Sequence, residues 1–239
     1  MLRMRVGARR LTPLFRAKNT IAARTAKAFG CGAKRRHDDM VFDFDSFCGE
    51  VRRALDRERT VIARSDLVRA AVLVPIVWRE GEAFILFTQR TMSVARHKGQ
   101  ISFPGGAAER EDTDSIATAL REAREEIGLD PGLVEIAGIL SDGVTSTGFV
   151  VTPVVGFVDA KAPYTADPAE VAEVFELPLS RLADPAAHKV EIIDDCGRSY
   201  LNHSFAVDGR LVWGVTGRIL ASFFDSLAET GALAPWPAR

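Results

Sequence analysis

The segment that most restricts the fold of this 239-residue chain lies between residues 114 and 129 and has the pattern of an amphipathic helix. Asp114 or Ser115 can cap its first turn, and Gly128 can end it. The apolar side chains recur at helical spacing and form one face, which consists of Ile116, Ala119, Leu120, Ala123 and Ile127. The sequence therefore predicts a helix over residues 114–128 with one apolar side.

The same helix carries three carboxylates, Glu122, Glu125 and Glu126, at positions i, i+3 and i+4. At about 100° per residue, these side chains fall within an arc of about 100°. Such like charges repel one another, which a sequence tolerates on a solvated face or where a divalent cation neutralises the cluster. Acidic triplets are common on solvated faces, so the triplet alone does not predict a metal site. If a metal binds, oxygen ligands favour Mg²⁺ or Mn²⁺ over zinc.

A glycine pair, Gly105 and Gly106, lies upstream of the helix at the end of a strand-like run. Paired glycines allow a close approach of the backbone and leave carbonyl groups free to face a metal or a phosphate. Asp112 and Arg121 supply an acid and a base that could tie the loop to the helix. A glycine-rich loop before a helix with three carboxylates indicates a metal-assisted phosphate site.

Residues 105–129, GGAAEREDTDSIATALREAREEIGL, resemble the Nudix box, whose pattern is G-x5-E-x7-R-E-U-x-E-E-x-G-U, with U a bulky apolar residue. Ala123 is small where a bulky residue is expected. Asp112 stands at the first Glu position, but eight residues rather than seven separate it from Arg121. The residues on the pattern are Gly106, Arg121, Glu122, Glu125, Glu126, Gly128 and Leu129.

Further segments resemble one branch of that superfamily, the coenzyme A pyrophosphatases. Residues 86–106, LFTQRTMSVARHKGQISFPGG, look like the motif that precedes the box in that branch. Residues 141–158, 169–189 and 212–220 also resemble it. The similarity covers about residues 45–225 and leaves the N-terminal segment outside.

The resemblance implies a metal-dependent hydrolase that splits coenzyme A or acyl-coenzyme A to 3′,5′-ADP and 4′-phosphopantetheine or its acyl derivative. Its implied cofactor is Mg²⁺ or Mn²⁺, held by Glu122, Glu125, Glu126 and the carbonyl of Gly106. Divalent ions bridge phosphate oxygens and lower the pKa of the attacking water. The expected catalytic residues are Glu125, Glu122 and Arg121, and the expected substrate-binding residues are Arg90, Arg96, Gln100 and Gly105.

The residue that accepts the proton of the water stays open at this stage. Glu125 could be a metal ligand or the base. Glu170 and Glu173 are runner-up bases, and they are equally well explained as solvated acids on a short helix.

Two rival functions are kept. The first is a Nudix pyrophosphatase that acts on ADP-ribose, a nucleotide sugar or a nucleoside triphosphate, against which the segment around residues 96–106 argues. The second is a non-catalytic nucleotide-sensing or nucleic-acid-binding module, which the basic N-terminal segment supports and the intact triplet of glutamates opposes.

The remaining segments alternate between strand and helix patterns. Apolar runs over residues 70–78 and 83–90 around Gly81 predict a β-hairpin, and Pro75 favours an edge or a bulge in the first run. The other predicted elements are a helix over residues 41–63, strands over 134–140 and 149–158, a short helix over 169–175 and a helix over 212–228. This order predicts an α+β fold, an α/β/α sandwich. The resemblance implies a Nudix fold with a central mixed sheet flanked by helices.

Charge is distributed unevenly along the chain. Residues 1–36 hold eleven Lys and Arg residues and no Asp or Glu, whereas the remaining 203 residues hold 20 basic and 32 acidic residues. We expect residues 1–39 to be a disordered leader and residues 40–239 to be the hydrolase domain, with Met40 as a possible true start. A cytoplasmic location follows, or a mitochondrial one if the leader is a transit peptide.

Composition excludes several classes of protein. Hydrophobic residues make up 47% and charged residues 26%, which is typical of a soluble globular protein, and no apolar run approaches the ~20 residues of a membrane span. The three cysteines have no zinc spacing and predict free thiols in a reducing compartment. The expected partner is a small-molecule substrate, without nucleic acid or membrane, and the expected state is a monomer or homodimer.

Overall fold

The computed structural model describes residues 43–92, 99–195 and 198–231. The predicted leader over residues 1–39, the start at Met40 and the substrate-binding residue Arg96 lie outside the described residues. The cytoplasmic location and its mitochondrial alternative therefore stay predictions.

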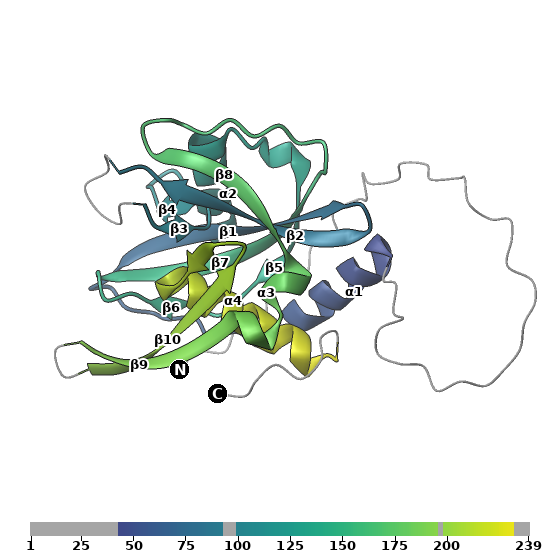
Figure 1. Cartoon of the computed structure of the whole chain (residues 1–239). Helices are drawn as coiled ribbons and strands as arrows, with labels where there is room; N and C mark the ends of the chain where they lie inside the picture. Colours follow the sequence, from purple (N-terminus) through teal and green to yellow (C-terminus); the bar gives the residue numbers. More distant parts are fainter. Residues whose placement is uncertain (1–42, 93–98, 196–197, 232–239) are drawn as a thin grey trace, which may run out of the picture. The chain divides into compact units, whose positions relative to one another are not determined.

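A mixed eight-stranded sheet occupies the centre of the described fold (Figure 1). Strands β1 (Val68–Arg79) and β7 (Phe149–Val158) pair in parallel along ten residues, and both are nearly continuous apolar runs, as strands buried on both faces require. β2 (Glu82–Arg90) runs antiparallel to β1, which confirms the predicted hairpin. Its two-residue turn has a positive φ at Glu80 and Gly81, the conformation of a type I′ turn.

Shorter strands extend this sheet. β5 (Val134–Ile139) and β6 (Gly143–Val144) pair with β7, and β8 (Val171–Pro178) pairs with β2. β3 (Ile101–Ser102) pairs with β2, and β4 (Gly105–Ala107) pairs with β1. The glycine pair is therefore part of a strand that lies against the centre of the sheet.

Helices cover both faces of the sheet. α2 (Ser115–Ile127) buries Ala119, Ala123 and Ile127 in a cluster with Leu73 of β1 and Val154 of β7. α1 (Phe44–Leu55) and α4 (Gly214–Glu229) belong to a second cluster, on the face of β1 that carries Val74 and Ile76. The α+β fold with a central mixed sheet flanked by helices is thus confirmed. Among the described helices, none is long and apolar enough to cross a membrane.

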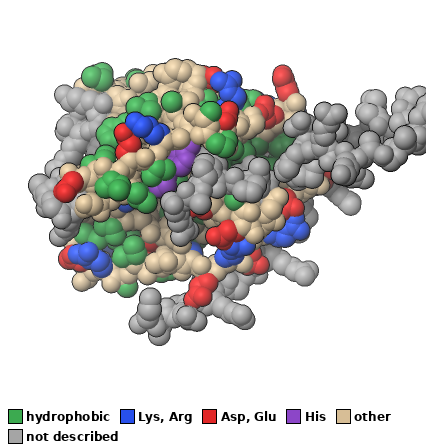
Figure 2. All heavy atoms as spheres, turned by 60° about the horizontal axis from the view of Figure 1, so that its bottom comes forward, with side chains coloured by type: hydrophobic (Ala, Val, Ile, Leu, Met, Phe, Trp, Pro, Cys, Tyr) green, Lys and Arg blue, Asp and Glu red, His purple; other side chains and the backbone are tan. Residues whose placement is uncertain are grey.

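A second antiparallel sheet, absent from the sequence prediction, precedes α4. It consists of β9 (His188–Asp195), β10 (Arg198–Val207) and β11 (Arg210–Val212). Phe205 packs against Phe224 of α4, with ring centroids 5.9 Å apart. Part of the surface of this second sheet is apolar, and Figure 2 shows hydrophobic side chains beside the histidines. Three short helical segments complete the described fold, namely η2 (Pro131–Leu133), α3 (Leu179–Leu182) and η3 (Pro185–Ala187).

Three local predictions were wrong. Pro75 lies at neither an edge nor a bulge, because β1 is a central strand and pairs without a register shift with β7 there. Residues 169–175 do not form a helix, because residues 171–178 pair with β2 from Phe84 to Arg90. The predicted helix over residues 41–63 ends at Leu55. Beyond it, the backbone amides of Thr60 and Ile62 donate to Ser141 Oγ and Asp142 Oδ2, at 3.0 and 2.9 Å. Both errors in the predicted helices arise from pairing between distant parts of the chain.

Only one cysteine is described. Cys48 is a free thiol on the buried side of α1, and burial raises its pKa to about 12.

Candidate active site

Helix α2 is fixed at both ends by the residues that the sequence indicated. The Asp114 carboxylate accepts a hydrogen bond from the amide of Ala117 at 2.9 Å. Gly128 ends the helix with a φ of 65°, a left-handed conformation that glycine adopts without steric cost. Ala119 and Ala123 are fully buried against the sheet, and the carboxylates of Glu122 and Glu126 lie against the glycine strand β4.

Arg121 joins this helix to the loop that precedes it. Its Nε and Nη2 atoms donate to Asp112 Oδ1 and Oδ2 at 3.1 and 3.0 Å, and Nη2 also donates to the carbonyl of Ala107 at 2.9 Å. The bidentate pair lowers the pKa of Asp112 to about 2 and raises the pKa of Arg121. The structure thus brings Asp112 and Arg121 together despite the extra residue between them.

The third nitrogen of Arg121 holds two of the predicted site glutamates. Nη1 donates to Glu122 Oε1 at 3.0 Å and to Glu125 Oε2 at 2.9 Å. The Glu122 side chain is only 17% exposed, and its burial raises its pKa, whereas the Glu125 side chain is 53% exposed. Of the two, Glu125 is the one that solvent reaches.

Glu126 is the most deeply buried acid of the described residues near the helix, with 5% exposure. Its carboxylate accepts from the amide of Gly105 at 3.2 Å and from Arg90 Nη1 at 3.4 Å. Burial outweighs these two contacts and raises the pKa of Glu126 to about 7. A cation bound here would relieve the cost of ionising this group.

Arg90 links this site to a fourth carboxylate. Its Nη2 lies 3.3 Å from Glu170 Oε2, and the carbonyl of Glu170 accepts from the amide of Thr91 at 2.9 Å. The pairing of β2 with β8 changes register between Gln89 and Arg90, which is a common irregularity beside functional sites. Arg90 therefore lies inside the carboxylate cluster.

The two runner-up bases separate in the structure. Glu170 joins the cluster, and its charge contributes to the raised pKa values of Glu122 and Glu126. Glu173 instead forms a bidentate pair with Arg210, at 2.7 and 3.1 Å. No local sequence signal distinguishes the two, since their separation depends on the register between β2 and β8.

The two glycines of β4 have different neighbours. A Cβ atom on Gly105 would lie 2.5 Å from the carbonyl oxygen of Ala71 and 2.6 Å from Cα of Val72. A Cβ atom on Gly106 would instead lie 2.5 Å from Glu122 Oε1. Gly105 thus permits the close approach of β4 to β1, and Gly106 leaves room for a carboxylate against the backbone.

Among the described residues, no three acidic, cysteine or histidine side chains are gathered as a ready-made metal site. The four carboxylates are instead held by two arginines, since Arg121 holds Glu122 and Glu125, and Arg90 holds Glu126 and Glu170. These oxygen atoms nevertheless suit a hard divalent cation, because such a cation prefers carboxylate and carbonyl oxygens, here including the backbone carbonyl of Gly106, as ligands. Such an ion would replace the ion pairs that now neutralise the cluster.

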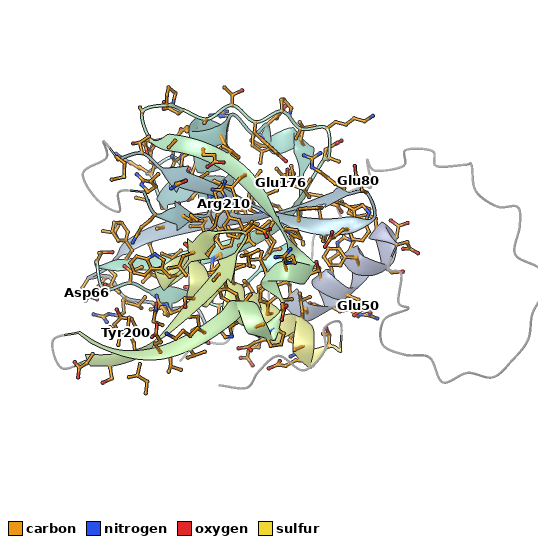
Figure 3. All side chains as sticks on the ribbon, in the orientation of Figure 1. Glu50, Asp66, Glu80, Glu176, Tyr200 and Arg210 are labelled. Atoms are coloured by element: carbon orange, nitrogen blue, oxygen red, sulfur yellow. The ribbon has the colours of Figure 1, made fainter. Side chains whose placement is uncertain are left out.

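Gln100 lies beside this cluster. Its carbonyl accepts from the amide of Arg90 at 3.0 Å, and it lines an open groove of about 610 Å³ with residues of the β10–β11 turn. Arg210, labelled in Figure 3, belongs to the same groove. The predicted residues therefore divide between the cluster, which holds Arg90, and the groove, which holds Gln100.

Comparison with known proteins identifies relatives of the chain. The model of the NUDIX domain family matches residues 67–195. A protein of Escherichia coli O7:K1, named Uncharacterized Nudix hydrolase NudL, is 41% identical over 152 residues, which cover 64% of this chain and 79% of that protein.

Two solved structures are also similar. A Nudix hydrolase from M. smegmatis, RenU, has a TM-score of 0.47 and 18% identity over 72% of this chain and 90% of that chain. A C. elegans Ap4A hydrolase has a TM-score of 0.41 and 18% identity over 48% of this chain and 82% of that chain.

Proposed function

Because the chain belongs to the NUDIX domain family and is a pyrophosphatase of its hydrolase class, we propose that it acts on coenzyme A or an acyl-coenzyme A. The products are 3′,5′-ADP and 4′-phosphopantetheine or its acyl derivative. The assignment of the substrate is supported by residues 86–106, which precede the box and contribute Arg90, Gln100 and Gly105.

The convergence of four carboxylates beside the glycine strand β4 is the observation that supports a phosphate site. Glu122, Glu125, Glu126 and Glu170 are close enough that the charge of one raises the pKa of another. Like charges gathered in a partly buried site are costly unless cations neutralise them, as Arg90 and Arg121 do here, and a bound metal cation can take that place. We propose Mg²⁺ or Mn²⁺ as that cation, with Glu122, Glu125, Glu126 and the carbonyl of Gly106 as ligands.

When bound, the metal would neutralise the diphosphate charge and increase the acidity of the attacking water. The residues of the chain hold the donors in place. Arg121 orients Glu122 and Glu125 through one nitrogen and is itself held by Asp112. Glu125 is half exposed, so it can accept a proton from a water at the edge of the site. Glu170 is also half exposed and is the second candidate for this role.

The substrate is tested by incubating the full chain with coenzyme A and Mg²⁺ or Mn²⁺ and identifying the products by mass spectrometry. We expect masses of 3′,5′-ADP and 4′-phosphopantetheine, and no turnover in the presence of a chelator. Hydrolysis in ¹⁸O-labelled water then identifies the phosphorus atom that is attacked.

A comparison of kcat/KM across diphosphate substrates tests the rival Nudix activities. Higher values for ADP-ribose, a nucleotide sugar or a nucleoside triphosphate than for coenzyme A would overturn the substrate assignment. The absence of metal-dependent turnover on every substrate would instead favour the non-catalytic binding module.

Glu125→Gln tests the link between the cluster and turnover. We expect it to reduce kcat by about 100-fold or more while the fold is retained. Glu50→Gln removes an acid from α1, on the opposite face of the sheet, and serves as the matched control.

A further inference from the structure

The open groove that contains Gln100 is formed by two segments far apart in the sequence. One wall comes from the end of β2 and the start of β3, with Gln89, Gln100 and Ile101. The other comes from the β10–β11 turn and the residue before α4, with Arg210, Leu211 and Trp213. The volume of about 610 Å³ is within the range of sites for small organic ligands.

The charges in the groove are already neutralised. Arg210 donates to both oxygens of Glu173, and its guanidinium lies 3.6 Å from the ring centroid of Phe175. Asp208 accepts from Arg181 Nη2 at 2.9 Å. A phosphate would therefore have to compete with Glu173 for Arg210, so the groove favours an uncharged ligand.

Two exposed apolar side chains and a side-chain amide also line the groove. Leu211 and Trp213 are 54% and 43% exposed, which is unusual for side chains of their size. The Gln89 side-chain amide is held by the carbonyl of Gly99 at 3.3 Å. A ligand with an apolar surface and hydrogen-bonding groups would cover the exposed side chains and pair with such amides.

The groove and the carboxylate cluster lie at the same end of β2, on opposite faces of the sheet. Side chains alternate along β2, so that Phe87 packs in the hydrophobic core on the α4 face of the sheet and Leu86 packs in the hydrophobic core on the α2 face. Gln89 accordingly faces the groove, and the next residue, Arg90, reaches Glu126. A ligand bound at both places would pass the ends of β2 and β3, where the amide of Arg90 bonds to the carbonyl of Gln100.

We propose that this groove binds the uncharged arm of the diphosphate substrate, with Trp213 and Leu211 as specificity-determining residues. The inference rests on the proposed function, since it requires a substrate with a diphosphate and an uncharged arm. In coenzyme A this arm is pantetheine, which carries amides on an aliphatic chain, whereas the adenosine arm carries a charged 3′-phosphate that would compete with Glu173 for Arg210.

Binding is measured without hydrolysis, in metal-free protein, by the fluorescence of Trp213. We expect saturable quenching by pantetheine and none by 3′-phosphoadenosine, the charged arm of coenzyme A. Trp213→Phe should remove the change, which separates it from any signal of the other tryptophans. If pantetheine causes no saturable quenching at millimolar concentrations, or if only 3′-phosphoadenosine causes it, the proposal is wrong.

A kinetic test uses Leu211→Ser, which keeps the strand and removes the exposed apolar side chain. We expect KM for coenzyme A to rise about tenfold with kcat nearly unchanged. Trp213→Ala should act in the same direction, and because Trp213 precedes α4, its melting temperature is checked first. Ile192→Ser is the matched control, since Ile192 is 75% exposed on β9 and does not line the groove.

The two proposals fail in distinguishable ways. Quenching without hydrolysis of coenzyme A would contradict the proposed function and retain the groove as a binding site. Hydrolysis of coenzyme A with an unchanged KM in Leu211→Ser and without quenching would contradict the groove alone.

Discussion

Arg121 and Asp112 form a bidentate ion pair, with nitrogen–oxygen distances of 3.1 and 3.0 Å, that joins helix α2 to the loop before it. Asp112 is 7% exposed in its side chain, and Arg121 is 15% exposed. The same guanidinium holds Glu122 and Glu125. The pair therefore stabilises the loop and also orients two of the acids that we assign to the metal.

Asp112→Asn is expected to reduce the free energy of unfolding by about 1–2 kcal/mol at pH 7. The pKa of Asp112 is lowered to about 2 from 3.8, so its contribution is present above pH 3.8 and is lost as the pH falls through 2. Urea unfolding of wild type and variant at pH 7 and pH 2.5 measures the difference, which should shrink at the lower pH. Glu109→Gln is the control, because Glu109 lies 3.9 Å from Arg121 and is 61% exposed. An equal loss of unfolding free energy in both variants would contradict a specific stabilising role of the Asp112–Arg121 pair.

Gly105→Ala is expected to lower stability, whereas Gly106→Ala is expected to lower activity. The new methyl group at Gly105 meets the backbone of β1, which cannot move aside, and should cost about 1–3 kcal/mol of stability. At Gly106 it meets the carboxylate at the far end of the Glu122 side chain, which can turn aside, so stability should change by less than about 0.5 kcal/mol while kcat falls by about 100-fold. Thermal unfolding and turnover, measured on both variants, separate these effects. Retained activity in Gly106→Ala would show that Glu122 is not needed at its present position.

The elements predicted well from the sequence are those that local residues determine. Helix α2 begins after the cap at Asp114 and ends at Gly128, and both signals lie within the helix sequence or next to it. The strand at β8 was missed because its conformation depends on pairing with β2, 80 or more residues away in the chain. For the same reason the sequence could not place Glu170 beside Arg90 or Glu173 beside Arg210. The second sheet was missed because β9 and β10 are held mainly by each other and by α4.

Glu126→Gln is expected to reduce activity and increase stability in metal-free protein. Because burial raises the folded pKa of Glu126 to about 7 from 4.5, its ionisation costs stability progressively as the pH rises from 4.5 through 7. At pH 8 the neutral glutamine should therefore raise the free energy of unfolding by about 1–3 kcal/mol, and at pH 4 it should have little effect. Chemical denaturation with a chelator present measures both values. Glu125→Gln is the control, since the exposed Glu125 should show no such gain. A destabilised Glu126→Gln at pH 8 would contradict the burial argument.

Mild acid is expected to destabilise the second sheet through two histidines. His188 Nε2 and His203 Nδ1 lie 3.0 Å apart, and His188 also stacks on Phe205 at 4.6 Å. Burial lowers the pKa of both imidazoles, and the charge of His203 lowers the pKa of His188 further. Because the folded pKa values lie below the ordinary value of 6.5, the stabilising effect of the neutral pair is present above pH 6.5 and is lost as the pH falls through the folded values.

Loss of the hydrogen bond between the two rings should cost about 1 kcal/mol, seen as a lower melting temperature at pH 5 than at pH 7.5. His188→Phe keeps the stacking on Phe205 and removes one titrating group, so it should reduce this pH dependence. Lys189→Gln changes the neighbouring residue of β9, outside the imidazole pair, and should leave the dependence as in wild type. If His188→Phe melts with the same dependence on pH as wild type, acid acts on another group, because Asp225 and Arg218 also influence the charge of His203.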